Sequence, residues 1–108
     1  MELGDLDSAR RDYEQAISYS PDYYWPYMEL SDVLLALGKK DEAEEQALYA
    51  MELAPEKKNA YRLLADLYQQ EGDSSSACRM YLRILELDPQ DKSALKAVED
   101  LDNCEAEN

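Results

Sequence analysis

Hydrophobic and polar positions along this chain recur with the spacing of amphipathic helices. From Tyr27, the residues Leu30, Ser31 and Leu34 follow at steps of three, four and seven, which places all four on one helical face. The stretch that starts at position 61 repeats this spacing with Tyr61, Leu64, Ala65 and Tyr68. The pattern therefore predicts an all-α protein.

The chain repeats itself every 34 residues. Pro21, Pro55 and Pro89 stand 34 residues apart. Glycines and alanines keep the same step at Gly4, Gly38 and Gly72 and at Ala9, Ala43 and Ala77. Self-similarity at a fixed period of this length is typical of stacked structural repeats.

Each repeat contains two helical stretches. Gly38 and Gly72 are expected to end the first of them, because glycine accepts the left-handed conformation of a helix C-terminus. Asp41 and Asp73 follow and are placed to cap the second helix. The repeated prolines then stop the second helix and lead the chain into the next repeat.

A helix-turn-helix unit of 34 residues with these residue types resembles the tetratricopeptide repeat. The resemblance lies in Tyr27, Leu30, Ser31, Leu34, Gly38, Ala43, Ala50 and Pro55, and then in Tyr61, Leu64, Ala65, Tyr68, Gly72, Ala77, Tyr81 and Pro89. Ala47 departs from it, because the family usually has an aromatic residue there, and Ser31 and Ala65 replace a common glycine. The resemblance implies a right-handed α-solenoid of stacked antiparallel helix pairs, with about five helices here.

We expect residues 1–103 to form one such array. It consists of an unpaired second helix at 5–20, full repeats at 24–57 and 58–91, and a capping helix at 92–103 with polar late positions. Residues 104–108 are expected to form an acidic, disordered tail. Because both ends of the array are out of frame, a piece of a longer array and a short protein are both consistent with the sequence.

The amino-acid composition narrows the range of possible functions and partners. Eleven Lys and Arg against 25 Asp and Glu give a net charge of −14, which disfavours nucleic acid and anionic membranes as partners. Neither a leader-like N-terminus nor an apolar membrane span is present, so a cytoplasmic protein is expected. Cys78 and Cys104 lie in different contexts and imply no disulfide framework, and Cys78 is expected to be a small packed residue.

The candidate chemistry does not favour an enzyme. The chain has no histidine, and its paired carboxylates, such as Asp41 with Glu42, fit a solvated helix start. Neither acidic turn, at 71–73 or at 88–91, has the ligand spacing of a calcium loop. Tyr19, Tyr23, Tyr24 and Trp25 crowd one turn between repeats, but without nearby basic residues they are no platform for stacking bases. No cofactor or metal is predicted.

The resemblance implies that the first helices of successive repeats line a concave groove for a peptide or helix. By elimination of the core face, the groove positions are Trp25, Met28, Asp32, Leu35, Asn59, Arg62, Asp66, Gln69, Lys96 and Asp100. Trp25 and Met28 fit an interface anchor. They fit equally well as residues that pack on neighbouring tyrosines or on the N-terminal helix.

Asp32, Asp66 and Asp100 keep the 34-residue step and would form a row of carboxylates that favours a basic ligand. Alternatively they are ordinary surface charges, since Arg62 and Lys96 stand four residues before two of them and could neutralise them. A family subclass binds acidic chaperone tails through lysine and asparagine on these faces. Aspartates stand here instead, which argues against that ligand.

Two functions remain open. The first is a non-enzymatic protein-interaction module that binds a basic or apolar peptide or helix on its first-helix face. The second is a structural element that forms homo-oligomers or docks into a longer array through its terminal helices. The N-terminal stripe of Leu6, Tyr13 and Ile17 would supply that self-association edge, because only half of it is needed to cover the next helix.

Overall fold

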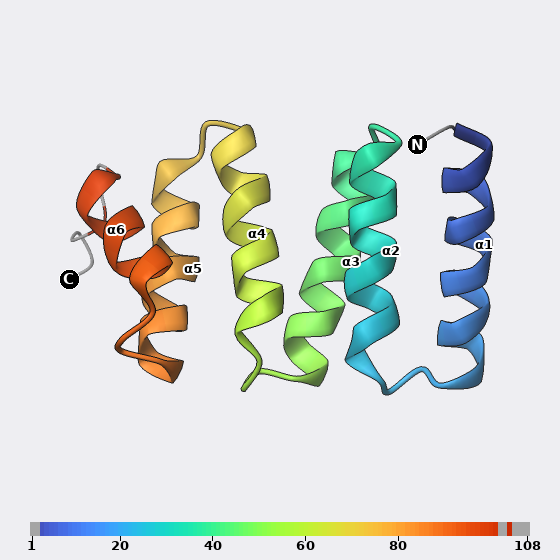
Figure 1. Cartoon of the computed structure of the whole chain (residues 1–108), viewed down its shortest axis with the longest axis horizontal. Coiled ribbons are helices and arrows are strands. Elements are labelled where there is room, and N and C mark those ends of the chain that lie inside the picture. Colours follow the sequence, from blue (N-terminus) through green and yellow to red (C-terminus); the bar gives the residue numbers. More distant parts are fainter. Residues whose placement is uncertain (1–2, 102–103, 105–108) are drawn as a thin grey trace. The chain divides into compact units, whose positions relative to one another are not determined.

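The computed structural model describes residues 3–101 and 104 and contains six helices in this part of the chain. Their bounds are α1 Leu3–Tyr19, α2 Tyr24–Ala36, α3 Lys40–Leu53, α4 Lys58–Gln70, α5 Ser74–Leu87 and α6 Lys92–Asp100 (Figure 1). The helices α2, α4 and α6 begin 34 residues apart, as the repeat predicts. The all-α fold is therefore confirmed, with one helix more than the expected five.

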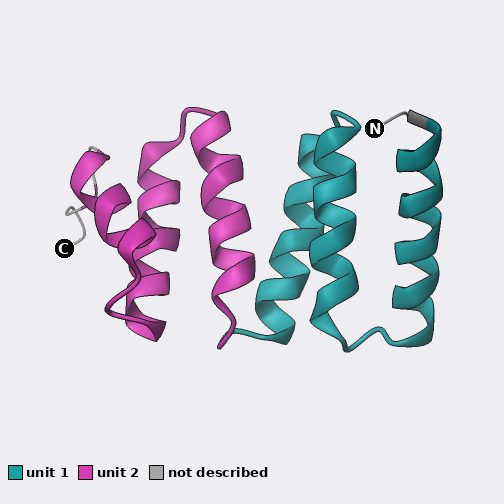
Figure 2. Cartoon of the chain, viewed as in Figure 1, with its two compact units in different colours: residues 1–55 teal, residues 56–108 magenta. Residues whose placement is uncertain are grey.

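The helices form two compact units, residues 1–55 and 56–108 (Figure 2). In the first unit α2 packs against both α1 and α3, and in the second α5 packs against both α4 and α6. The boundary falls at Pro55, one of the three prolines that define the repeat. The single array and the handedness of its solenoid involve both units together and stay predictions.

Small residues allow the helices of each unit to approach closely. Ala43, Ala47 and Ala50 on α3 are fully buried, so at position 47 a small side chain packs in the core where the family usually has an aromatic residue. Ser31 on α2 is also fully buried, and its hydroxyl donates a 2.6 Å hydrogen bond to the carbonyl oxygen of Ala43. The serine that replaces a family glycine thus links α2 to α3 without leaving a polar group unsatisfied.

The repeated glycines end the first helix of each repeat, as predicted. Gly38 and Gly72 have φ values of 82° and 78°, in the left-handed region that glycine adopts without strain. The backbone N–H of the following residue, Lys39 or Asp73, then donates a 2.8 Å hydrogen bond back to a carbonyl of the preceding helix. These bonds satisfy carbonyl groups that the helix end would otherwise leave open.

One of the two predicted helix caps is wrong. Asp73 is the N-cap of α5, where its side chain accepts a 3.1 Å hydrogen bond from the N–H of Ser76. Asp41, in contrast, lies inside the first turn of α3, whose N-cap is Lys39. The reason is the repeat itself, because the position 34 residues before Asp73 is Lys39 and not Asp41.

The absence of a disulfide framework is also wrong. Cys78 on α5 and Cys104 beyond α6 form a disulfide, with their Cα atoms 5.1 Å apart, and both residues are buried. Because α6 packs against α5, the segment that follows α6 can reach Cys78 on α5. Cys104 was expected in a disordered tail but is part of the packed second unit, and residues 105–108 of that tail lie outside the described residues.

Candidate functional site

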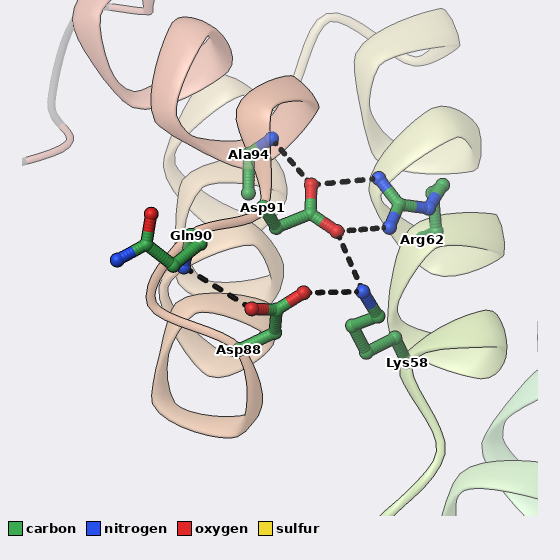
Figure 3. A network of polar contacts seen from close by, with 6 residues as sticks. All are labelled: Lys58, Arg62, Asp88, Gln90, Asp91 and Ala94. Carbon is green, nitrogen blue, oxygen red and sulfur yellow. Dashed lines mark hydrogen bonds and ion pairs between the residues drawn. The ribbon is translucent and has the colours of Figure 1, made fainter.

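The second unit carries a network of ion pairs between the start of α4 and the turn that leads into α6 (Figure 3). The Lys58 ammonium donates to Asp88 at 2.8 Å and to Asp91 at 2.9 Å. The Arg62 guanidinium reaches both carboxylate oxygens of Asp91, at 2.7 Å and 3.4 Å. Two cations of α4 therefore hold the α5–α6 turn in place.

Asp91 is the centre of this network and is also the N-cap of α6. Its side chain is only 8% exposed, and it accepts a 3.0 Å hydrogen bond from the backbone N–H of Ala94. The Arg62 guanidinium, then the Ala94 N–H and the Lys58 ammonium, hold the pKa of Asp91 well below its usual range. Asp91 is thus ionised at neutral pH, and the groups that bind its carboxylate all belong to the second unit.

The ion pairs of Asp91 determine whether Arg62 is available to pair with Asp66. The sequence left open whether Arg62 neutralises Asp66 one turn further along α4. In the structure, Arg62 pairs with Asp91 instead, and Asp66 forms no ion pair in the described part of the chain. Burial raises the pKa of Asp66, and the charge of Arg62 opposes that shift only in part. Asp66 is consequently a solvent-accessible carboxylate without a dedicated cation.

Gln69, another predicted groove residue, also has a partner within the second unit. Its side-chain amide donates a 2.8 Å hydrogen bond to the hydroxyl oxygen of Tyr81 on α5. Burial raises the pKa of Tyr81, and the nearby charge of Asp66 raises it further. Arg62, Asp66 and Gln69 of α4 therefore form a polar cluster with Tyr81 of α5, and among the described residues the Asp66 side chain has no hydrogen-bond partner.

The remaining groove positions of the second unit are open to solvent. Asn59 is exposed. Lys96 and Asp100 form an ion pair of 3.4 Å along α6 with side chains 77% and 59% exposed, an arrangement that contributes little to stability. The pairing that the sequence left open thus occurs at Asp100 but not at Asp66.

In the first unit, the structure separates residues that the sequence grouped on one stripe. Trp25 is 42% exposed and makes an edge-to-face contact with Tyr24, whereas Met28 is only 8% exposed. Met28 is therefore a packing residue of α2, which α1 and α3 flank, and has little surface for a ligand. Asp32 is exposed and Leu35 is half-buried. The alignment of Asp32 with Asp66 and Asp100 involves both units and stays a prediction.

The proposed self-association edge on α1 is mostly turned toward the first unit itself. Leu6 is buried, and Tyr13 and Ile17 are half-buried. The Tyr13 hydroxyl donates to the Glu29 carboxylate on α2 at 3.5 Å, and burial together with the charge of Glu29 raises the pKa of Tyr13. These contacts leave a small apolar surface on this stripe of α1, and homo-oligomerisation stays a prediction.

Sequence reasoning missed Lys58, Tyr81, Asp88 and Asp91 as residues that organise this face. Asp91 had a recognisable signal, because an aspartate shortly after a helix-stopping proline is a strong N-cap candidate. Lys58 and Tyr81 had none, since their partners lie on other helices.

Comparison with known families agrees with this architecture. Two family models, both described as tetratricopeptide repeat, match the chain, one at residues 1–48 and one at residues 28–92. The chain belongs to the tetratricopeptide repeat family. Members of this family are typically non-enzymatic domains that bind peptides or proteins. No curated protein sequence matches this tetratricopeptide repeat chain significantly.

Solved structures share the fold at low sequence identity. The first tetratricopeptide repeat domain of Spaghetti (RPAP3), bound to the HSP90 peptide SRMEEVD, is 22% identical with a TM-score of 0.77, covering 86% of this chain and 76% of that one. The Arabidopsis OM64 domain is 22% identical with a TM-score of 0.78 and coverages of 89% and 79%. MamA is 19% identical with a TM-score of 0.74 and coverages of 92% and 70%.

Within residues 3–101 and 104, histidine, cysteine, aspartate and glutamate side chains do not gather in groups of three or more that could hold a metal ion. None of the helices in this part of the chain has both the length and the apolar character needed to span a membrane.

Proposed function

We propose that this tetratricopeptide repeat chain is a non-enzymatic interaction module that binds a peptide or helix of basic and apolar character on the faces of its first helices, α2, α4 and α6. The observation that carries the proposal is the commitment of Arg62 to Asp91. It leaves the exposed Asp66 carboxylate of α4 without an ion-pair partner among the described residues, close enough to Tyr81 for its charge to act on that hydroxyl.

A ligand cation would correct the unfavourable environment of Asp66. Burial raises the pKa of this carboxyl because its charged form is incompletely solvated. A lysine or arginine side chain placed against it would stabilise the charged form by a charge-assisted hydrogen bond.

The same residues argue against an acidic ligand. The RPAP3 domain binds the HSP90 peptide SRMEEVD, whose C-terminal part carries three acidic residues and a carboxylate. At the positions where the family subclass that binds acidic chaperone tails carries lysine and asparagine, this chain pairs Met28 with Asp32 and Arg62 with Asp66. Met28 is buried and Arg62 already holds Asp91, so no cation on these pairs is available for a carboxylate. The aspartates would repel it.

The test compares binding of a labelled amphipathic peptide of lysine and leucine by fluorescence anisotropy. Asp66→Asn should weaken binding about three- to tenfold, the effect of losing one partly exposed charge-assisted contact. Glu71→Gln is the matched control, because it removes an exposed charge from the same unit and should leave the affinity unchanged. Equal affinities of the wild type and Asp66→Asn, or a preference for a peptide of glutamate and leucine, would refute the proposal.

A further inference from the structure

A second surface, separate from the face of α4, lies at the turn between α1 and α2. We name it the aromatic turn and define it as Tyr19, Tyr23, Tyr24 and Trp25. Tyr19 is 80% exposed, Tyr23 54% and Trp25 42%. They belong to the first unit, where α1 ends and α2 begins (Figure 1). Exposed rings in such a group are unusual for residues that normally bury most of their surface.

Three of the four rings, those of Tyr23, Tyr24 and Trp25, are linked by edge-to-face contacts. Tyr23 meets Tyr24 edge to face with ring centroids 5.9 Å apart, and Tyr24 meets Trp25 in the same way at 6.3 Å. The turn beneath them is fixed, because the Tyr27 hydroxyl donates a 2.7 Å hydrogen bond to the carbonyl oxygen of Pro21. The backbone N–H of Tyr23 also donates to the Ser20 carbonyl at 3.2 Å. The exposed rings are thus attached to a turn that is closed by hydrogen bonds.

The hydrogen-bonding groups of the exposed rings are unused. The Tyr19 and Tyr23 hydroxyls and the Trp25 indole N–H make no hydrogen bond within the described part of the chain. Each exposed ring therefore offers both a π face and a polar edge, the combination for which tyrosine and tryptophan are enriched at interfaces.

Charge specifies what such a surface would bind. From residue 12 to residue 38 the sequence contains no lysine or arginine, while it contains five acidic residues, among them Asp22 inside the turn itself. A ring face attracts a cation that lies within about 6 Å of its centroid, and arginine is the most frequent partner. Asp22 forms no ion pair among the described residues, so this carboxylate and the exposed rings of Tyr19, Tyr23 and Trp25 can receive a cation from another molecule.

We propose that the aromatic turn binds an arginine-bearing segment of a partner protein. Guanidinium groups stack on the exposed faces of Tyr19, Tyr23 and Trp25, and Asp22 adds an attractive charge. Nucleic acid carries the wrong charge for this surface, and an acidic peptide would be repelled. The site uses other residues than Asp66 and does not depend on the function proposed for α4.

The experiment uses the intrinsic fluorescence of the full chain, in which Trp25 is the single tryptophan. A short capped peptide of alternating glycine and arginine should change the Trp25 emission saturably. The same peptide with citrulline in place of arginine keeps the shape but removes the charge, and it should have no effect. Tyr19→Ser and Tyr23→Ser should each weaken arginine-peptide binding about two- to fivefold, the range of one exposed cation–π contact.

Two control variants separate this proposal from the others. Leu95→Ser removes a side chain of similar exposure, 46%, from the second unit and should leave the titration unchanged. Asp66→Asn should also leave it unchanged, so that failure of the α4 site and failure of the aromatic turn are distinguishable. The proposal would be overturned if the citrulline peptide changed the Trp25 emission, or if both tyrosine variants bound the arginine peptide as tightly as the wild type. It would also be overturned if the emission depended on protein concentration alone, because a second copy of the chain would then be the occupant.

Discussion

Replacing Asp91 should destabilise the second unit in two separable steps. The carboxylate has two roles, because it caps α6 through the Ala94 N–H and pairs with two cations of α4, the Arg62 guanidinium and the Lys58 ammonium. Asparagine is as good an N-cap as aspartate but has no charge, so Asp91→Asn removes the pairing and keeps the cap. Asp91→Ala removes both. The two variants therefore divide the contribution of this residue.

The burial of Asp91 and Arg62 determines how much their ion pair contributes to the free energy of unfolding. The Asp91 side chain is 8% exposed but that of Arg62 is 35% exposed, so the pair lies between a surface salt bridge and a buried one. We expect Asp91→Asn to lower the free energy of unfolding by about 1–2 kcal/mol. Loss of the cap in Asp91→Ala should lower it by about 1 kcal/mol more.

Urea denaturation followed by far-ultraviolet circular dichroism measures these differences, while Trp25 fluorescence follows the first unit separately. Arg62→Met in the wild type and in Asp91→Asn completes a double-mutant cycle, which should give a coupling energy of about 1–2 kcal/mol. The reasoning is refuted if Asp91→Asn is as stable as the wild type, or if Asp91→Ala and Asp91→Asn are equally stable.

The same residue predicts a pH dependence. Because the pKa of Asp91 is lowered on folding, its contribution is complete above the pKa of unfolded aspartate, about 3.9, and is lost as the pH falls through the folded pKa. The stability difference between the wild type and Asp91→Asn should therefore be constant from neutral pH to about pH 5 and shrink in more acidic solution. A difference that grows on acidification would contradict this sign.

Three further changes test the fold. The disulfide between Cys78 and Cys104, 26 positions apart, should stabilise the oxidised chain by about 3.5 kcal/mol. A reductant should therefore lower the urea midpoint of unfolding of the wild type but not that of Cys104→Ser. Ser31→Ala removes the hydrogen bond to the Ala43 carbonyl and should cost about 1 kcal/mol in urea denaturation, and an unchanged stability would show that this bond contributes nothing. Gly72→Ala should lower the free energy of unfolding by about 1–2 kcal/mol, because alanine is strained at φ 78°, and a neutral effect would mean that the turn adjusts.

The periodic pattern of the sequence was sufficient to predict the helical class and where α2 and α4 begin. Helices α2 and α4 start at Tyr24 and Lys58, where the predicted repeats start, and Gly38 and Gly72 end the helices at which they were placed. These features are local, because each depends on residues within one or two helical turns.

The fate of individual site residues was harder to predict. Trp25 and Met28 belong to one stripe of the helical pattern, yet Trp25 is 42% exposed and Met28 only 8%. Periodicity identifies a face of a helix but not how many neighbours cover it. Since α2 is flanked by both α1 and α3, part of its apparent outer face is buried.

By itself, the sequence determined the helical class, the 34-residue repeat, the turns and the acidic surface, because these follow from spacing and composition along the chain. Only the tertiary structure decided that Arg62 holds Asp91, 29 positions away, and that Cys78 meets Cys104. Such pairs form when packed helices bring distant side chains within bonding distance. No local sequence pattern specifies which of several nearby carboxylates a flexible arginine side chain will pair with.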